Sequence, residues 1–296
     1  MRTMRFLVLM MLLATACQKD NSSKPSGILP EDGFRLQIND TLLLIAEHID
    51  FYDFSSHLIY LKEGSDFSCP EKGSFKVFIA EDEIFSGVIH PMYASSLPTG
   101  PAIYAAPCLY GDYAIAIDFA PHPEPDLHVS DPRGDSRIAD ILQKQNIYRA
   151  GLMAEILDVN PQGCCAMSIT LRLTNQEDSS VLYLDPDKMG MELFHYFTTG
   201  LYLLDEQNQI FTHHLTAQSP ADFNTWERKW LSVLDSQEST IITLNYEHFD
   251  AITQGQYKAN FTFPGLSRQV NRNELIQKDG RIWLGNLRLN QRVELE

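Results

Sequence analysis

The sequence predicts a mainly β fold in two domains behind a short N-terminal leader. Segments in which polar and apolar residues alternate recur between turn residues, as they do in half-buried strands. One segment, at about residues 135–146, has the apolar spacing of an amphipathic helix. The chain has 296 residues, which is enough for roughly two domains of about 100–200 residues each.

The leader, residues 1–16, has the features of a secretory signal peptide. Arg2 and Arg5 come first, an apolar run covers residues 6–13, and small residues follow at 14–16. A membrane-spanning helix needs about 20 apolar residues, so this run is too short to anchor the chain by itself. Cleavage after Ala16 would suit an ordinary signal peptidase, and it would also make Cys17 the first residue.

Cys17 and the residues before it resemble the lipobox of bacterial lipoproteins, in which the cysteine is lipidated. The family usually has leucine three positions before the cysteine; here that residue is Ala14, and Leu13 precedes it. Residues 17–33 read as a disordered tether, and residues 18–20 (Gln-Lys-Asp) are similar to the export signal of surface-exposed lipoproteins of the Bacteroidota. The resemblance implies a bacterial envelope location, at the outer membrane and facing the cell surface, with palmitate or a similar acyl chain as the membrane contact. Plain secretion and a generic linker are the alternatives.

Charge and cysteine content narrow the classes of partner. The formal net charge of −16 disfavours nucleic acid and anionic lipid headgroups as ligands. Apart from Cys17 there are four cysteines, and an oxidising compartment would permit disulfides. Cys69 with Cys108 is the plausible bridge, since the adjacent pair Cys164 and Cys165 would be strained; four free buried thiols are the alternative.

The first predicted domain, residues 34–155, is β-rich with one helix. Strands are expected at 41–46, 58–62, 74–80 and 113–119, followed by a proline-rich loop at 121–126. Asp135 can cap the helix, Ile138, Ile141 and Leu142 give it an apolar face, and Asn146 ends it. A returning strand is expected at 147–156.

The second predicted domain, residues 156–296, has the pattern of an antiparallel sandwich. Alternating strands are expected at 167–173, 200–204, 209–213, 242–246, 257–263 and 281–289. The segment 252–257, which ends at Tyr257, resembles the tyrosine corner of immunoglobulin-like sandwiches, although Ala259 stands where antibody domains have a cysteine. The resemblance implies an immunoglobulin-like β-sandwich and a hydrogen bond from Tyr257 to the backbone just before it.

No sequence motif for catalysis is found, so candidate sites depend on clusters of suitable side chains. Imidazole and carboxylate groups gather within eleven residues and could hold a divalent metal, or they could form an ordinary exposed loop: Asp118, His122, Glu124, Asp126 and His128. Trp226 and Trp230 would share a face if their segment were helical, where they could bind a glycan or cover the core. His213 and His214 alternate along a strand and should face opposite sides.

These observations favour a lipid-anchored binding or adhesion module of the cell envelope, without catalytic activity, whose ligand is a glycan or a protein. No cofactor is expected. An envelope hydrolase with a metal in the first domain is the first alternative, and a structural subunit whose sheet edges pair with a neighbour is the second.

Overall fold

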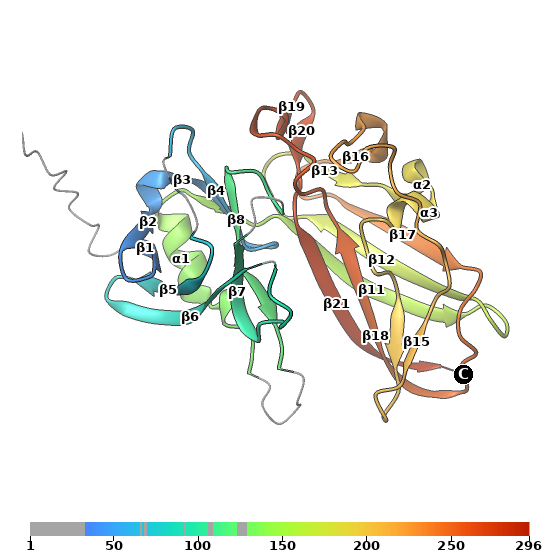
Figure 1. Cartoon of the computed structure of the whole chain (residues 1–296). Helices are drawn as coiled ribbons and strands as arrows, with labels where there is room; N and C mark the ends of the chain where they lie inside the picture. The colour runs from blue at the N-terminus through green and yellow to red at the C-terminus, as the bar shows by residue number, and fades with distance from the viewer. Residues whose placement is uncertain are drawn as a thin grey trace, which may run out of the picture. The chain divides into compact units, whose positions relative to one another are not determined.

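The structure, a computed structural model, describes residues 33–65, 67, 70–91, 93–105, 109–122 and 129–295. The predicted signal peptide, Cys17 and all but the last residue of the tether lie outside these ranges, as do Cys69 and Cys108. Residues from Asp32 to Glu296 form one compact unit, which contains all of the described elements (Figure 1). No helix within the described ranges is long and apolar enough to cross a membrane.

Two sheets are built from the first half of the unit. Sheet A has the strand order β2-β1-β5-β6-β7-β9, and sheet B has the order β10-β3-β4-β8. The strands are β1 (Phe34–Ile38), β2 (Leu42–Ile45), β3 (Ile49–Asp53), β4 (Leu58–Leu61), β5 (Gly73–Ile79), β6 (Asp82–Pro91), β7 (Gly100–Ala105), β8 (Ala114–Ala116), β9 (Asp118–Ala120) and β10 (Tyr148–Arg149).

Three sheets are built from the second half. Sheet C has the order β11-β12-β17, sheet D the order β16-β13-β20-β19, and sheet E the order β15-β14-β18-β21. The strands are β11 (Leu152–Pro161), β12 (Met167–Asn175), β13 (Val181–Leu184), β14 (Tyr202–Leu204), β15 (Ile210–Thr212), β16 (Leu231–Leu234), β17 (Ser239–Tyr246), β18 (Gly255–Pro264), β19 (Ile276–Gln277), β20 (Gly280–Ile282) and β21 (Asn286–Leu295).

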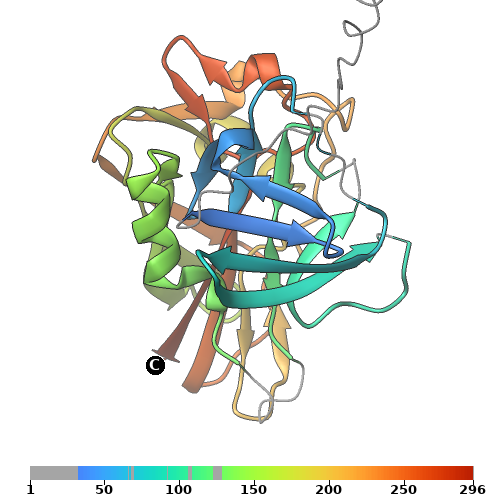
Figure 2. The ribbon, with the colours of Figure 1, turned by 90° about the vertical axis from the view of Figure 1, so that its left-hand side faces the viewer.

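Short helices join these strands. They are η1 (Ala46–His48), η3 (Pro132–Gly134), α1 (Ser136–Lys144), α2 (Pro186–Met189), α3 (Met191–Phe194), η4 (Arg228–Trp230) and η5 (Arg272–Glu274). The predicted helix is confirmed as α1: Asp135 caps it by accepting a hydrogen bond from the Arg137 N–H, and Ile138 and Leu142 are buried. Asn146, with φ of 58°, ends it as expected. Figure 2 shows α1 beside the strands of sheet A, where it contacts β1 and β5.

The alternation in the sequence places apolar side chains on the buried faces. In β12, Met167, Ile169, Leu171 and Leu173 are all buried, so the predicted strand at 167–173 is confirmed and extends to Asn175. Three expected strands are divided. The expected strand at 113–119 gives β8 in sheet B and β9 in sheet A, the one at 147–156 gives β10 and β11, and the one at 281–289 gives β20 in sheet D and β21 in sheet E.

The prediction of two domains, one of them an immunoglobulin-like antiparallel sandwich, is wrong in this structure. Residues 156–296 contribute to three sheets, and β13 pairs with β20 in parallel. In its number of sheets the unit corresponds to a five-bladed β-propeller arrangement rather than to a two-sheet sandwich, although sheet A has six strands and sheet C three. The predicted hydrogen bond of Tyr257 is present nevertheless, with its hydroxyl 3.0 Å from the Thr253 carbonyl oxygen.

One apolar core crosses the predicted domain boundary, which explains why there is a single unit. Phe51, Leu58, Tyr60 and Tyr113 from the first half pack in the same cluster as the cores of sheets C, D and E. A hydrogen bond adds to this contact, since the buried Tyr113 hydroxyl donates to the Val270 carbonyl at 2.6 Å. The boundary predicted at residue 155 therefore divides the sequence at a place where the packing is continuous.

Candidate functional site

A cavity of about 370 Å³ lies between the short helices α2 and α3 and the end of β17. Its apolar lining comes from Met189, Met191, Leu193, Leu215 and Tyr246. Tyr246 is buried, and the other four are half-buried. This volume falls within the range of about 300–1,000 Å³ that is typical of ligand pockets.

Local sequence explains the shape of one wall. Asp185 caps α2 by accepting a hydrogen bond from the Asp187 N–H, and Pro186 occupies the first turn, where a missing N–H has no cost. Gly190, with φ of 79°, separates α2 from α3. This bend places Met189 and Met191 on the same wall of the cavity. The segment 185–187 thus begins the helix that forms this wall.

The rim of the cavity is polar and acidic. It carries Glu192, Gln218, Asn245, Glu247 and His248, all exposed. Within the described ranges neither glutamate forms an ion pair, and no lysine or arginine lines the cavity. The electrostatic potential at the opening therefore favours a cationic group.

Backbone hydrogen bonds hold the rim segments in place. The Gln218 N–H donates to the Glu192 carbonyl at 2.9 Å, and the His214 N–H donates to the His248 carbonyl at 2.9 Å. On the other side of α2, the Lys188 ammonium donates to the Leu231 carbonyl at 2.9 Å. The cavity is therefore formed by segments that are tied to one another and, through Lys188, to β16.

Two histidine rings pack against Tyr246. The His213 ring stacks on it with a centroid distance of 4.9 Å, and the His195 ring meets it edge-on at 5.2 Å. The Tyr246 hydroxyl accepts a hydrogen bond from the Leu201 N–H, and burial raises the pKa of this phenol well above its usual range. Tyr246 therefore stays neutral, and its ring is a rigid part of the floor.

His195 is the most unusual polar residue near the site. Its side chain is only 4% exposed, and neither ring nitrogen makes a regular hydrogen bond. Burial, together with the neighbouring His213 ring, lowers the pKa of His195 to about 4, and the nearby Thr198 backbone opposes this shift. Gly200 leaves room for the pair, since a Cβ there would lie 2.4 Å from the His195 ring and 2.5 Å from the His213 ring. A neutral imidazole is thus enclosed at neutral pH.

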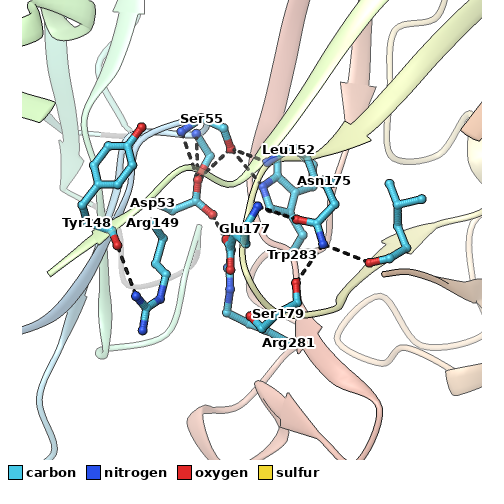
Figure 3. A network of polar contacts seen from close by, with 12 residues as sticks. Asp53, Ser55, Tyr148, Arg149, Leu152, Asn175, Glu177, Ser179, Arg281 and Trp283 are labelled. Atoms are coloured by element: carbon cyan, nitrogen blue, oxygen red, sulfur yellow. Dashed lines mark hydrogen bonds and ion pairs between the residues drawn. The ribbon is translucent and has the colours of Figure 1, made fainter. Parts of the chain in front are cut away.

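A second concentration of buried polar groups lies where β3 meets β20, and Figure 3 shows it. The buried Arg281 guanidinium contacts Asp53 at 2.8 Å and also Glu177, while it lies over the rings of Phe51 and Tyr60. All three charged side chains are nearly or fully buried. Because the group joins the two halves of the unit from within, we assign it to stability rather than to ligand binding.

Trp226 and Trp230, suggested as a glycan-binding surface, do not line this cavity. Trp230 is 4% exposed and belongs to the core cluster, and Trp226 is half-buried against that cluster. The segment is not the helix on which a shared face depended: only Arg228–Trp230 forms a 3₁₀ turn, so the two indoles do not share a helix face. Their positions favour the alternative of covering the core.

The suggested metal ligands are not gathered by the described part of the chain. Asp118 is paired with Arg288 at 2.9 Å, and His122 is half-buried. Glu124, Asp126 and His128 lie outside the described residues. Among the described residues no group of three or more potential ligands comes together. His213 and His214 face different neighbours as predicted, since His214 is 2.9 Å from Asp250 rather than near His195.

Comparison of the sequence with protein-family models finds no match, and comparison with curated proteins finds none either. The resemblances to bacterial lipoproteins and to immunoglobulin-like domains therefore gain no support from relatives. The immunoglobulin-like assignment is replaced by the five-sheet unit described above. Lipidation of Cys17 lies outside the described residues and stays a prediction.

Proposed function

We propose that the protein is a binding module that recognises a protein or peptide partner. The cavity beside Tyr246 would hold one apolar side chain of the partner, and a neighbouring lysine or arginine would lie near Glu192 and Glu247. The observation that carries this proposal is the combination of an apolar floor with an acidic rim in one cavity.

The chemistry of the floor supports an apolar side chain as the occupant. Methionine is flexible and polarizable, so Met189 and Met191 can adapt to side chains of different shape. Full burial of a leucine or phenylalanine side chain contributes about 1.5–3 kcal/mol, which is enough for a weak, specific contact. An apolar centre within a polar rim is also the usual arrangement of protein interfaces.

A glycan is the less favoured ligand for this cavity. Sugar rings bind on open aromatic faces, and Tyr246 is the one tyrosine, phenylalanine or tryptophan in the described lining. One face of its ring is already stacked on His213. The acidic rim also offers more to a cationic group than to neutral hydroxyls.

Binding of defined peptides to the purified full chain tests the proposal. A labelled peptide with a central leucine between lysines should bind measurably by fluorescence anisotropy, and replacing the leucine by alanine or the lysines by glutamates should weaken it about tenfold or more. Met191→Gln, which places an amide on the floor, should also weaken binding about tenfold, while Glu247→Gln should reduce it a few fold and lower its salt dependence.

Glu206→Gln is the matched control, because Glu206 is an exposed glutamate at the turn between β14 and β15 and is not part of the cavity lining. It removes the same charge from an acidic chain and should leave binding unchanged. Equal affinity for the leucine and alanine peptides, or equal effects of Glu247→Gln and Glu206→Gln, would show that attraction is only general charge and would contradict the proposal.

A further inference from the structure

Two adjacent thiols stand at the end of the β11–β12 hairpin. Residues 162–166 join the strands, with the Gln162 N–H donating to the Ala166 carbonyl at 2.8 Å and Gly163 at φ of 80°. Cys164 and Cys165 are both exposed and unoxidised. Their sulfur atoms are 3.2 Å apart, with the Cys165 thiol donating to the Cys164 sulfur.

The two thiols are not equivalent. Because its proton is held by the Cys164 sulfur, the pKa of the Cys165 thiol is raised from its usual value. Cys164 is the sulfur that accepts this hydrogen bond. It also lines a small cavity of about 120 Å³, formed with Asp250, Ile252 and Thr253 of the segment before β18.

We propose that Cys164 and Cys165 form a modification site, a vicinal dithiol that exchanges with a low-molecular-weight disulfide such as oxidised glutathione. The Cys164 thiolate attacks one sulfur of the small disulfide, forms a mixed disulfide and releases one thiolate. The Cys165 thiol then loses its proton to solvent and attacks the Cys164 sulfur, releasing the second thiolate. Two protein thiols are oxidised by two electrons, and one small disulfide is reduced to two thiols.

The product would be a strained disulfide and therefore easily reduced. Disulfides usually join residues whose Cα atoms are about 4.4–6.8 Å apart, whereas neighbouring Cα atoms are about 3.8 Å apart. Closing the ring must therefore change the backbone at the Cys164–Cys165 peptide. Strained, exposed disulfides have higher reduction potentials than structural ones, so reduced glutathione should open this bond again.

Formation of the disulfide ring should change the backbone hydrogen bonding of the neighbouring segment at Phe249. The Cys165 carbonyl accepts a hydrogen bond from the Phe249 N–H at 2.8 Å, and Phe249 directly follows the end of the main cavity's rim at His248. A change at the Cys165 peptide should weaken this bond. Amide hydrogen exchange at Phe249 should accordingly speed up on oxidation, while the Asp250 amide, bonded to the Thr212 carbonyl, should change less.

The reaction can be followed directly in the purified full chain. Tryptic cleavage after Arg149 and Arg172 releases the peptide 150–172, which contains both thiols and no other cysteine. After incubation with oxidised glutathione, mass spectrometry should show this peptide short of two hydrogen atoms. Subsequent reduced glutathione should restore its original mass.

Single variants separate the two roles. Cys165→Ser lacks the second thiol and should accumulate a glutathione adduct on Cys164, whereas Cys164→Ser should form the adduct on Cys165 at least several fold more slowly. Both residues are exposed, so both variants should fold, which circular dichroism checks. Stable glutathione adducts on both cysteines of the unmodified chain, without an intrapeptide disulfide, would overturn the proposal, as would equal adduct rates in the two variants.

Discussion

At the scale of single residues, the buried His195, which packs against the half-buried His213, shows what enclosure does to an ionisable side chain. A histidine in water is about half charged near pH 6.5, but His195 is held neutral to about pH 4 by its surroundings. Among the described residues, the titratable groups whose rings contact the His195 ring are His213 and Tyr246. Protonation of the His195 ring therefore opposes folding.

This has a measurable consequence for stability. Between pH 6.5 and pH 4 the unfolded chain binds a proton at His195 that the folded chain excludes, so the free energy of unfolding should fall as the pH falls. The contribution is complete above pH 6.5, and about 3 kcal/mol of it should be lost by pH 4. Urea unfolding at a series of pH values, compared between the unmodified chain and His195→Asn, measures the difference.

His57 provides an independent check of this effect. Burial and the nearby Arg133 lower the pKa of His57 to about 3, so its contribution has the same sign. His57→Asn should flatten the pH dependence separately, and the two substitutions together should flatten it further. An unchanged slope in both single variants would show that neither histidine is enclosed as described.

Residue-level prediction from the sequence succeeded where a motif is local. The hydrogen bond between Tyr257 and Thr253 spans four residues, so the sequence around it was sufficient to predict it. The relation of Trp226 to Trp230 depended on an assumed helix, and their burial depends on distant partners. Residue type alone offered core burial as one interpretation of Trp230, but nothing in residues 224–230 indicated which distant residues would cover it.

At the scale of elements, α1 was predictable because its signals are contained within it. The cap, the apolar spacing and the terminal asparagine all lie in the sequence of the helix. By contrast, α2 and α3 have four residues each and no apolar repeat long enough to recognise. The cavity that they border was therefore missed.

The cap of α1 gives a prediction at this scale. Asp135→Ala removes the acceptor of the Arg137 N–H and should lower the free energy of unfolding by about 1 kcal/mol. Asp140→Ala is the control, since Asp140 is exposed within the same helix and alanine is a better helix former there. It should leave stability unchanged or raise it slightly.

Urea midpoints at an unchanged slope provide the measurement for both variants. If the two substitutions shifted the midpoint equally, the effect would be one of lost charge, and the capping role of Asp135 would be refuted.

At the scale of the whole molecule, the buried ion pairs of Arg281 determine whether the two halves of the unit unfold together. Asp53 from β3 and Glu177 from the connection between β12 and β13 are both buried against this single guanidinium. Arg281→Met would leave two carboxylates enclosed without their cation. We expect a loss of about 3–5 kcal/mol in the free energy of unfolding.

Amide hydrogen exchange in Arg281→Met should become faster in both halves of the unit, in β3 as well as in β12 and β13. Arg172→Met is the control: its ion pair with Glu155 is exposed and should contribute at most about 1 kcal/mol. A loss confined to the strands after residue 152 would contradict the view that Arg281 couples the two halves.

The two-domain prediction failed at this scale for a physical reason. Strand patterns report which faces are buried, but not which other strands bury them. Phe51 and Tyr60 stack on each other and fit an independent first domain equally well, yet they belong to the core cluster of the second half and lie beneath Arg281. The mainly β class was confirmed because it depends on the elements alone, while the number of units depends on contacts that no local pattern records.

The span of these contacts also governs how the chain can be made. Asp53 and Arg281 are separated by 228 positions, and Tyr113 and Val270 by 157. A growing polypeptide that has emerged only as far as β10 has its strands but lacks the partners that complete the burial of Phe51, Leu58, Tyr60 and Tyr113. The nascent chain therefore keeps apolar surface exposed until synthesis is nearly finished. During that interval it should depend on chaperones more than a protein whose two halves fold one after the other.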